Sequence, residues 1–508
     1  MRYRLSPNAW LALGFVAALL MLKAMWSLPE VVTWKQTTDS HLPHIVFVVA
    51  DDLGWNDVSW HNPLIKTPHL DRYRRAGVTL NTSYMAPFCS PSRASFMTGY
   101  YAHKTGLQHI PIIHHKLMYL PSRFTMLPEL LKKKGYATHV IGKWHFGFCN
   151  WRYTPRKRGF DSFLGYYGGQ EGYYNHTNGN VEEGYDFRFN EEVLLDPKKE
   201  YGQFHYVKRA EEVIANHDKS RPLFLYLPFQ SVHKPLEAPK RFVDMYSHIE
   251  PEFRRIYSGM VSAMDESFGN ITDALERHGF MDNLLLVFTS DNGGAPDITA
   301  GGNNWPLRGG KFSLWEGGTR VPAFIYSKTL LAKTGYTSNE LIHAVDWFPT
   351  FLGLAGITPS EHIDGIDQWS MLSEGKPSKR KEFVYNIDEV DQNAAIRVGD
   401  YKLMKGEPGR YSGWYPLPEP DTIPPTEYPM WKRRPTTPRL FPEYQLYNIR
   451  DDPEERRDLA VQKPDVVRKL KARLARHEQW TVPSQNPPTD LNSLPHNYGG
   501  VWTPGWCR

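Results

Sequence analysis

Cysteine is scarce in this sequence, since 508 residues contain only Cys89, Cys149 and Cys507. A framework of many disulfides is therefore excluded, and a chain this long buries about three-quarters of its unfolded surface, enough to fold without one. Clustered basic charge is lacking too, because the net charge is only +5 and basic runs are as short as Lys132-Lys133-Lys134. We therefore expect no nucleic-acid partner, while an acidic polysaccharide is permitted.

Long apolar runs are lacking except near the N-terminus. Arg2 and Arg4 precede an apolar run from Trp10 to Leu22, which Lys23 interrupts. That length suits the core of a signal peptide and is short for a membrane span. Because no clear cleavage site follows, residues 1–26 are read as a signal peptide or an uncleaved signal anchor, and both direct the chain into the secretory pathway.

Buried strands and helices alternate through the first two-thirds of the chain. Residues 44–50 form a continuous β-branched apolar run, and similar strands are expected at 136–141, 222–229 and 284–290. This order predicts an α/β domain over residues 42–369, with a doubly wound sheet between two helix layers. Residues 370–508 are expected to form a small α+β subdomain with a short antiparallel sheet and a Pro-rich loop at 411–442.

Polar side chains follow the predicted strands where each one ends. They are Asp51, Asp52, Lys143, His145, His233, Asp291 and Asn292. The carboxyl ends of strands in a doubly wound sheet meet at one edge, so we expect these residues to share a site. Alternation in an extended chain would place Lys143 and His145 on the same side. Two adjacent carboxylates also suit a turn with an N-cap Asp, so that reading stays open for Asp51 and Asp52.

The ligand types indicate which metal such a site would hold. Asp51, Asp52, Asp291 and Asn292 offer three carboxylates and one amide oxygen, which are hard donors. Such donors suit Ca²⁺ or Mg²⁺, whereas a zinc pair would want histidine. We favour Ca²⁺.

Residues 89–93, Cys-Ser-Pro-Ser-Arg, carry the most specific pattern of the chain. Ser90 and Pro91 are typical of an N-cap and a first helical position, which would put Cys89 at the positive end of a helix. A lone Cys at such a place is equally well explained as a buried thiol. The string as a whole, however, resembles the Cys-x-Pro-x-Arg signature of the sulfatase family. Further matching strings are Ala94 to Gly106, Gly142 to His145, Gln230 to Pro235, Leu307 to Lys311 and Trp315 to Gly318, and the resemblance spans about residues 42–505.

The resemblance implies an alkaline-phosphatase-like fold and a covalent mechanism. Cys89 would be oxidised to formylglycine by the formylglycine-generating enzyme, and the aldehyde hydrate would attack sulfur. An oxygen of this residue would complete the metal shell formed by Asp51, Asp52, Asp291 and Asn292. The other implied roles are these: Arg93 holds the hydrate, His145 hydrogen-bonds it and acts as base, Lys143 and Lys311 neutralise sulfate, and His233 protonates or steers the leaving oxygen.

If Cys89 is converted to formylglycine, two cysteines remain, and two can form one disulfide. We therefore expect Cys149 to pair with Cys507, tying the C-terminal tail to the catalytic domain. Three sequons, at Asn81, Asn175 and Asn270, are candidates for glycosylation.

Within the family, the strings are most similar to those of arylsulfatase B, an N-acetylgalactosamine-4-sulfatase, and of arylsulfatases I and J. The implied function is removal of sulfate from chondroitin or dermatan sulfate, in the lysosome or after secretion. This chain departs from that group in its low Cys content and in Ser90, where Thr is common. Alternatives are action on another sulfate ester, a phosphate or phosphonate ester hydrolase on the same scaffold, and a catalytically dead glycosaminoglycan-binding protein. No pattern indicates an oligomeric state.

Overall fold

A computed structural model describes residues 42–179, 181–297, 299–359, 362–414 and 441–508. The predicted signal segment 1–26 and residues 415–440 of the predicted Pro-rich loop lie outside this range. Residues from Leu42 to Arg508 form one compact unit. Within the described ranges, no helix is both long and apolar enough to span a membrane.

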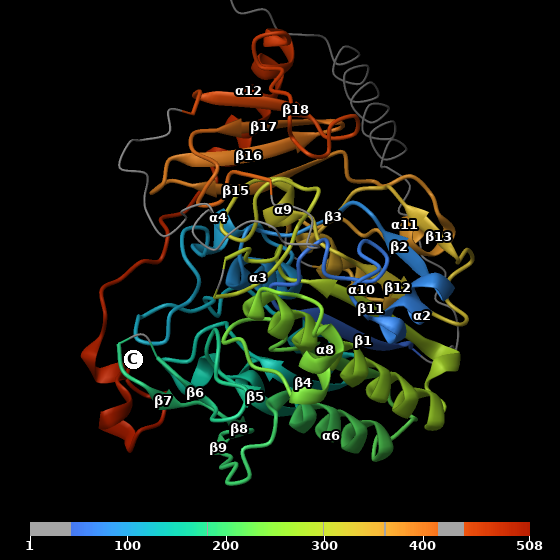
Figure 1. The fold of residues 1–508 in the computed structure, drawn as a ribbon, viewed down its shortest axis with the longest axis vertical. Helices are drawn as coiled ribbons and strands as arrows, with labels where there is room; N and C mark the ends of the chain where they lie inside the picture. The colour runs from blue at the N-terminus through green and yellow to red at the C-terminus, as the bar shows by residue number, and fades with distance from the viewer. Residues whose placement is uncertain (1–41, 180, 298, 360–361, 415–440) are drawn as a thin grey trace, which may run out of the picture. The chain divides into compact units, whose positions relative to one another are not determined.

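A mixed ten-stranded sheet forms the centre of the molecule (Figure 1). In spatial order its strands are β13 (Tyr336–Ser338), β2 (Val78–Leu80), β12 (Phe324–Tyr326), β11 (Leu284–Ser290), β1 (His44–Ala50), β10 (Leu223–Pro228), β4 (Ala137–Lys143), β5 (Ser162–Tyr166), β8 (Arg188–Phe189) and β9 (Glu192–Val193). The five neighbours from β11 to β5 are parallel. β1 and β11 have the bounds expected from the sequence.

Strand β1 shows why the sheet is covered on both faces. Its side chains alternate between two apolar cores, with Phe47 in one and Val48 in the other. The first core takes residues from α3 (Cys89–Thr98), α5 (Leu127–Lys133) and α10 (Trp347–Leu354). The second takes residues from α2 (Pro68–Ala76), α6 (Gly202–Ala215) and α8 (Glu252–Arg277). The doubly wound α/β fold is confirmed.

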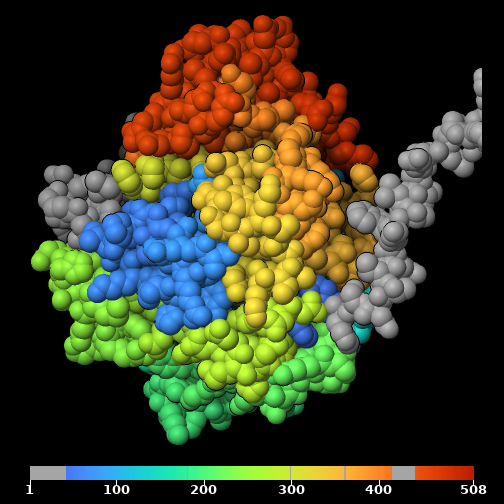
Figure 2. Space-filling view, turned by 90° about the vertical axis from the view of Figure 1, so that its right-hand side faces the viewer, coloured from blue at the N-terminus to red at the C-terminus, as the bar shows by residue number. Residues whose placement is uncertain are grey.

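A separate antiparallel sheet lies near the C-terminus. Its strands are β15 (Glu382–Asp388), β16 (Asn393–Val398), β17 (Tyr401–Lys405) and β18 (Tyr444–Asn448), with α12 (Pro464–Glu478) packed on it. Its apolar side chains share a core with Tyr84, Trp315 and Val345 of the large domain. Figure 2 shows these C-terminal segments, in orange and red, packed against the yellow segment of the large domain.

Shorter elements complete the fold. They are β3 (Ser83–Tyr84), β6 (Thr177–Asn178), β7 (Gly184–Tyr185), β14 (Ile342–His343), α4 (Ala102–Thr105), α7 (Lys240–Val243), α9 (Glu316–Thr319) and α11 (Trp369–Glu374). The abundance of Gly, Tyr and Asn predicts a long loop over residues 165–190, and the structure instead has the end of β5 and the whole of β6, β7 and β8 there. Two-residue strands are too short to leave a periodic pattern.

The C-terminal tail returns to the large domain, where a disulfide joins Cys149 to Cys507, the expected pair. The backbone N–H groups of Gly505 and Trp506 also donate to the carbonyl of Cys149. Cys89 is the free cysteine, and it is buried.

Candidate active site

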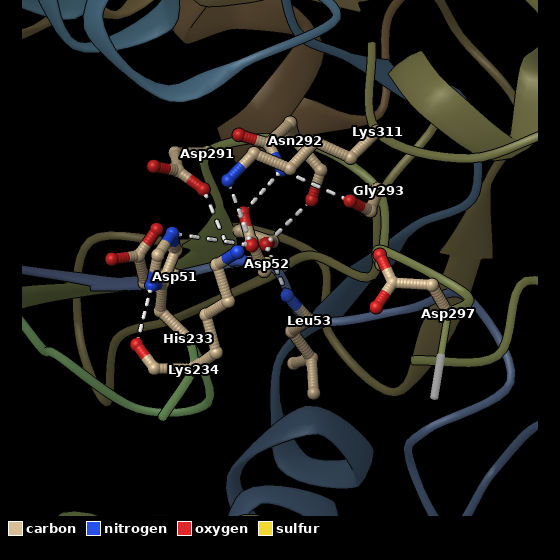
Figure 3. Close-up of polar contacts among 12 residues, drawn as sticks. Asp51, Asp52, Leu53, His233, Lys234, Asp291, Asn292, Gly293, Asp297 and Lys311 are labelled. Atoms are coloured by element: carbon tan, nitrogen blue, oxygen red, sulfur yellow. Dashed lines mark hydrogen bonds and ion pairs between the residues drawn. The ribbon is translucent and has the colours of Figure 1, made fainter. Parts of the chain in front are cut away.

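The carboxyl ends of β1, β4, β10 and β11 bring the predicted site residues together. β1 lies between β10 and β11, so Asp51-Asp52 is flanked by the segments that carry His233 and Asp291. The backbone N–H of Asp52 donates to Asp291 Oδ1 at 3.2 Å, and Asn292 Nδ2 donates to Asp52 Oδ1 at 2.7 Å. Figure 3 shows Asp51, Asp52, Asp291, Asn292, His233 and Lys311 converging on one point.

The backbone at Asp52 explains how two consecutive carboxylates enter one cluster. Side chains alternate along a strand, so Asp51 and Asp52 would ordinarily point apart. Asp52, however, has φ of 60°, in the left-handed region that L-residues rarely adopt. The change of direction after β1 lets both carboxylates reach the site, and such backbone strain is common at functional positions.

Three cationic side chains neutralise the three carboxylates. Arg93 of α3 contacts Asp291 Oδ2 through Nε at 2.9 Å and Nη2 at 2.7 Å. Lys143, at the end of β4, donates to Asp51 at 2.7 Å, and Lys311 donates to Asp52 at 2.8 Å. These groups are almost fully buried, and burial leaves such charges stable only when they are paired.

The pKa directions follow from burial and from these pairs. Burial raises the pKa of Asp51 to about 7, against the opposing charges of Lys143 and Arg93. The pKa of Asp52 is instead lowered, because the charges of Lys311 and Lys143 and the hydrogen bond from Lys311 oppose the effect of burial. Burial also raises the pKa of the Cys89 thiol. An unmodified Cys89 is therefore a neutral thiol and a weak nucleophile.

Unsatisfied oxygen atoms show that a metal fits here. Asp51 Oδ1 and Asn292 Oδ1 are buried without a hydrogen-bond partner among the described residues. Donor atoms of Asp51, Asp52 and Cys89 lie within 4.8 Å of one another. Buried oxygen atoms of this kind normally have a partner, and a hard dication would supply it. The sulfur of Cys89 is a soft donor that suits Ca²⁺ poorly, so an oxygen at position 89 would fit better.

The two site histidines are both held in one tautomer by backbone carbonyls. His145 Nε2 contacts the carbonyl of Ile112 at 2.9 Å, and His233 Nδ1 contacts that of Lys234 at 2.7 Å. A carbonyl only accepts, so these nitrogens carry the proton, and His145 Nδ1 and His233 Nε2 are hydrogen-bond acceptors. Burial lowers the pKa of both rings, with Lys143 adding to the effect at His145 and Lys311 at His233.

Two expectations about local geometry were wrong. His145 has φ of 59°, so it does not share a face with Lys143 by strand alternation. Helix α3 begins at Cys89 with Phe88 as N-cap, so Ser90 is not the cap. The Ser90 hydroxyl instead accepts from the N–H of Ile112 at 2.9 Å and lies 3.1 Å from His145 Nε2. These contacts with distant residues outweigh the local capping preference.

Ser90 is therefore a site residue that the sequence does not reveal by itself. Tyr226 of β10 is another, since its buried hydroxyl lies close to Arg93 and the Arg93 charge opposes the effect of burial on its pKa. Tyr226 falls inside an apolar strand, where a Tyr is ordinarily read as core. The sequence feature that could have indicated a site role for Ser90 is its position next to Cys89 in the motif.

The three predicted glycosylation residues are placed differently. Asn270 on α8 and Asn175 are exposed, while Asn81 is half-buried and donates from Nδ2 to Asn339 Oδ1 at 2.6 Å. Modification of all three stays a prediction.

Comparison with known proteins identifies the class. Residues 43–357 match the sulfatase family, and the chain belongs to it. It is therefore a sulfuric ester hydrolase. It is 39% identical to mouse arylsulfatase J over 99% of this chain and 91% of that protein. It is 33% identical to rat N-acetylgalactosamine-6-sulfatase over 71% of each chain. Among solved structures, Ps i-CgsB in complex with k-i-k-neocarrahexaose is 28% identical, with a TM-score of 0.74 over 88% of this chain and 96% of that one.

Proposed function

We propose that this sulfatase removes sulfate from sulfated sugars, with N-acetylgalactosamine 4-sulfate units of chondroitin or dermatan sulfate as the preferred substrate, and that position 89 is formylglycine in the active protein. The observation that carries the proposal is the convergence of Cys89 with three carboxylates, an amide and three cations at one sheet edge.

The charges at this edge suit an anionic substrate once a dication is bound. Asp51, Asp52 and Asp291 are balanced by Arg93, Lys143 and Lys311. A bound Ca²⁺, held by Asp51, Asp52, Asp291 and Asn292, would supply electrophilic stabilisation of a sulfate oxygen. The net positive charge of the site would then attract a sulfate ester.

The chain's own residues orient the reaction. The formylglycine hydrate at position 89 would supply the nucleophile for sulfur. His145, with its proton on Nε2, offers Nδ1 as the base that accepts the proton of the hydrate. Arg93 fixes Asp291 and lies beside the hydrate, and Lys143 and Lys311 face the sulfate oxygens.

His233 has a narrower role in this scheme than the sequence suggests. Its ring is neutral and its proton lies on Nδ1, facing the carbonyl of Lys234. Nε2 is then an acceptor 3.6 Å from Asp52 Oδ2. This supports steering of the substrate, by accepting from a hydroxyl, over protonation of the leaving oxygen.

One relative supports N-acetylgalactosamine as the sugar and favours a second ester, whereas the preference for the 4-sulfate comes from the sequence resemblance. The 33% identical rat protein is named for the 6-sulfate of N-acetylgalactosamine, so that ester is the alternative substrate. The structure of Ps i-CgsB holds an oligosaccharide. We further propose a secretory route with the lysosome as destination, glycosylation at Asn175, Asn270 and Asn81, and modification of Cys89 by the formylglycine-generating enzyme.

Two measurements on protein from a secretory host test the proposal. Peptide mass spectrometry should find an aldehyde in place of the thiol at position 89. Purified protein in Ca²⁺ should release sulfate from defined 4-sulfated oligosaccharides faster than from 6-sulfated ones, with an aryl sulfate as the generic control. Faster release of sulfate from the 6-sulfated oligosaccharides would overturn the assignment of the 4-sulfate as the preferred substrate. A thiol at position 89, with no release from the three substrates, overturns the function and favours a binding protein.

A further inference from the structure

A second group of metal-ligand side chains lies outside the sulfate site, where α6 meets the segment 171–200. His176 precedes β6, Asp196 follows β9, and His205 lies in the first turn of α6. Their ligand atoms lie within 4.8 Å of one another. None of the three belongs to the motifs that resemble other sulfatases.

The distances fit a tetrahedral ion. His205 Nε2 lies 3.1 Å and His176 Nε2 3.6 Å from the same oxygen, Asp196 Oδ2. Zinc binds nitrogen and oxygen at about 2.0–2.2 Å, so two ligands at tetrahedral corners lie roughly 3.3 Å apart. Each of the two imidazole nitrogens is already near that spacing from the carboxylate oxygen.

His176 shows the sign of a missing partner. Its side chain is fully buried, yet Nε2 makes no hydrogen bond among the described residues, although it faces Asp196. Its other nitrogen, Nδ1, lies 3.3 Å from Glu171 Oε1, and Tyr206 donates to the same oxygen at 3.2 Å. A carboxylate behind a histidine is the usual support of a zinc-bound imidazole, because it fixes the tautomer with Nε2 free.

Carboxyl groups surround the three ligands. Glu171 and Asp186 are buried next to each other, and Asp196 is nearly buried at the edge of the group. The buried side chain of Arg188 lies near Asp186. A dication at His176 would add positive charge beside these carboxyl groups.

We propose that His176, Asp196 and His205 bind one zinc ion, with water in the fourth position. The ion would join three separate parts of the chain. The carbonyl of Glu171 accepts from Gln230 Nε2, and the Tyr173 hydroxyl contacts the carbonyl of His233 at 2.9 Å. Zinc would thereby stiffen the segment that supports His233. This inference does not depend on the identity of the sulfate ester.

Metal content is the direct test, on the full-length protein with Ca²⁺ in excess so that the proposed calcium site is filled. Wild-type protein is dialysed with ZnCl₂, then against zinc-free buffer that contains Ca²⁺, and zinc per chain is measured by mass spectrometry. Asp196→Asn and His205→Gln remove one ligand each. His205 is partly exposed, so we expect the His205→Gln protein to fold normally. His248→Gln is the matched control, because His248 is exposed and lies outside the cluster.

We expect one zinc per chain in wild type and in His248→Gln, and an affinity at least about 100-fold lower in both ligand variants. Co²⁺ in place of zinc should give the visible absorption of a tetrahedral site in wild type only. Zinc should also slow hydrogen exchange in peptides covering 171–205. Zinc retained by Asp196→Asn and His205→Gln, zinc displaced by Ca²⁺, or no zinc in wild type overturns the proposal. The last result would mean that His176 is an imidazolium held between Glu171 and Asp196.

Discussion

At the scale of single residues, Lys311 links the carboxylates to the substrate. It neutralises Asp52, and its charge holds the pKa of that carboxyl low. In the proposed reaction it also faces the sulfate. Lys311→Met keeps the length of the side chain and removes the charge.

Lys311→Met should lower kcat for an aryl sulfate by about 10²–10³-fold, the usual cost of removing one preorganised charge from a reaction site. The measurement is steady-state turnover, with Lys240→Met as control because Lys240 is exposed on α7. Turnover within twofold of wild type would contradict the role of Lys311.

A second residue, His103, sets a pH dependence of stability. His103 of α4 is buried, and neither ring nitrogen has a hydrogen-bond partner among the described residues. Burial, together with the charges of His477 and Lys104, lowers its pKa from 6.5 to about 3. The unfolded chain therefore binds a proton below pH 6.5 that the folded chain cannot bind, so stability is lost as the pH falls through that range.

Between about pH 7 and pH 5, this one group should cost roughly 2 kcal/mol of the free energy of unfolding. His103→Leu should remove that part of the acid sensitivity. Urea unfolding at both pH values measures it, because groups common to both proteins cancel in the difference. An identical pH dependence in wild type and variant would show that His103 titrates normally in the fold.

The sequence predicted which residues lie at the site better than it predicted their backbone conformation. The carboxylates and Lys143 lie where their position after a strand placed them. The left-handed backbone at Asp52 and His145 was not predictable, because both depend on contacts across the sheet edge. Ser90 likewise made contacts with Ile112 and His145 that no local preference indicates.

At the scale of elements, a buried ion cluster joins the four-stranded sheet to α9 of the large domain. Lys402 on β17 contacts Glu316 of α9 at 3.1 Å and Glu455 at 2.7 Å, and all three are fully buried. Glu316 also accepts from the hydroxyls of Tyr84 and Tyr385. Lys402 is thus a cation shared by two buried carboxylates, and Arg397 and Arg320 add positive charge near Glu316.

Lys402→Met should destabilise the protein by about 3–5 kcal/mol, because it leaves buried charges uncompensated. Lys405→Met on the same strand removes a partly exposed pair with Glu478, and should cost no more than about 1 kcal/mol. Thermal unfolding in the presence of Ca²⁺ compares the stabilities of the two variants. Equal small shifts for both variants would mean that the cluster adds no stability.

The elements themselves were predictable in proportion to their length. Strands β1 and β11 have the expected bounds, since each is a run of seven residues with a strong apolar pattern. The apolar residues of α8 recur at helical spacing and are buried in the core. The two-residue strands β6 to β9 were not predicted, and they lie between two of the proposed zinc ligands, His176 and Asp196.

At the scale of the whole molecule, the order of the strands makes the site. Asp51, His145, His233 and Asp291 come from four strands spread over about half the chain, and they meet because β4, β10, β1 and β11 are neighbours and parallel. The edge was predictable from the rule for doubly wound sheets. The order within the sheet was not, because apolar strands of similar composition do not specify their neighbours.

Sulfate release by Cys89→Ala tests the central claim most directly. The variant removes only the side chain that would become formylglycine, and leaves the three ion pairs of the site in place. Aryl sulfate hydrolysis is measured for wild type and variant in Ca²⁺, with thermal unfolding as the check on folding. We predict a variant that unfolds close to the wild-type temperature and has no detectable turnover. Wild-type-like turnover by Cys89→Ala would contradict the covalent role of position 89.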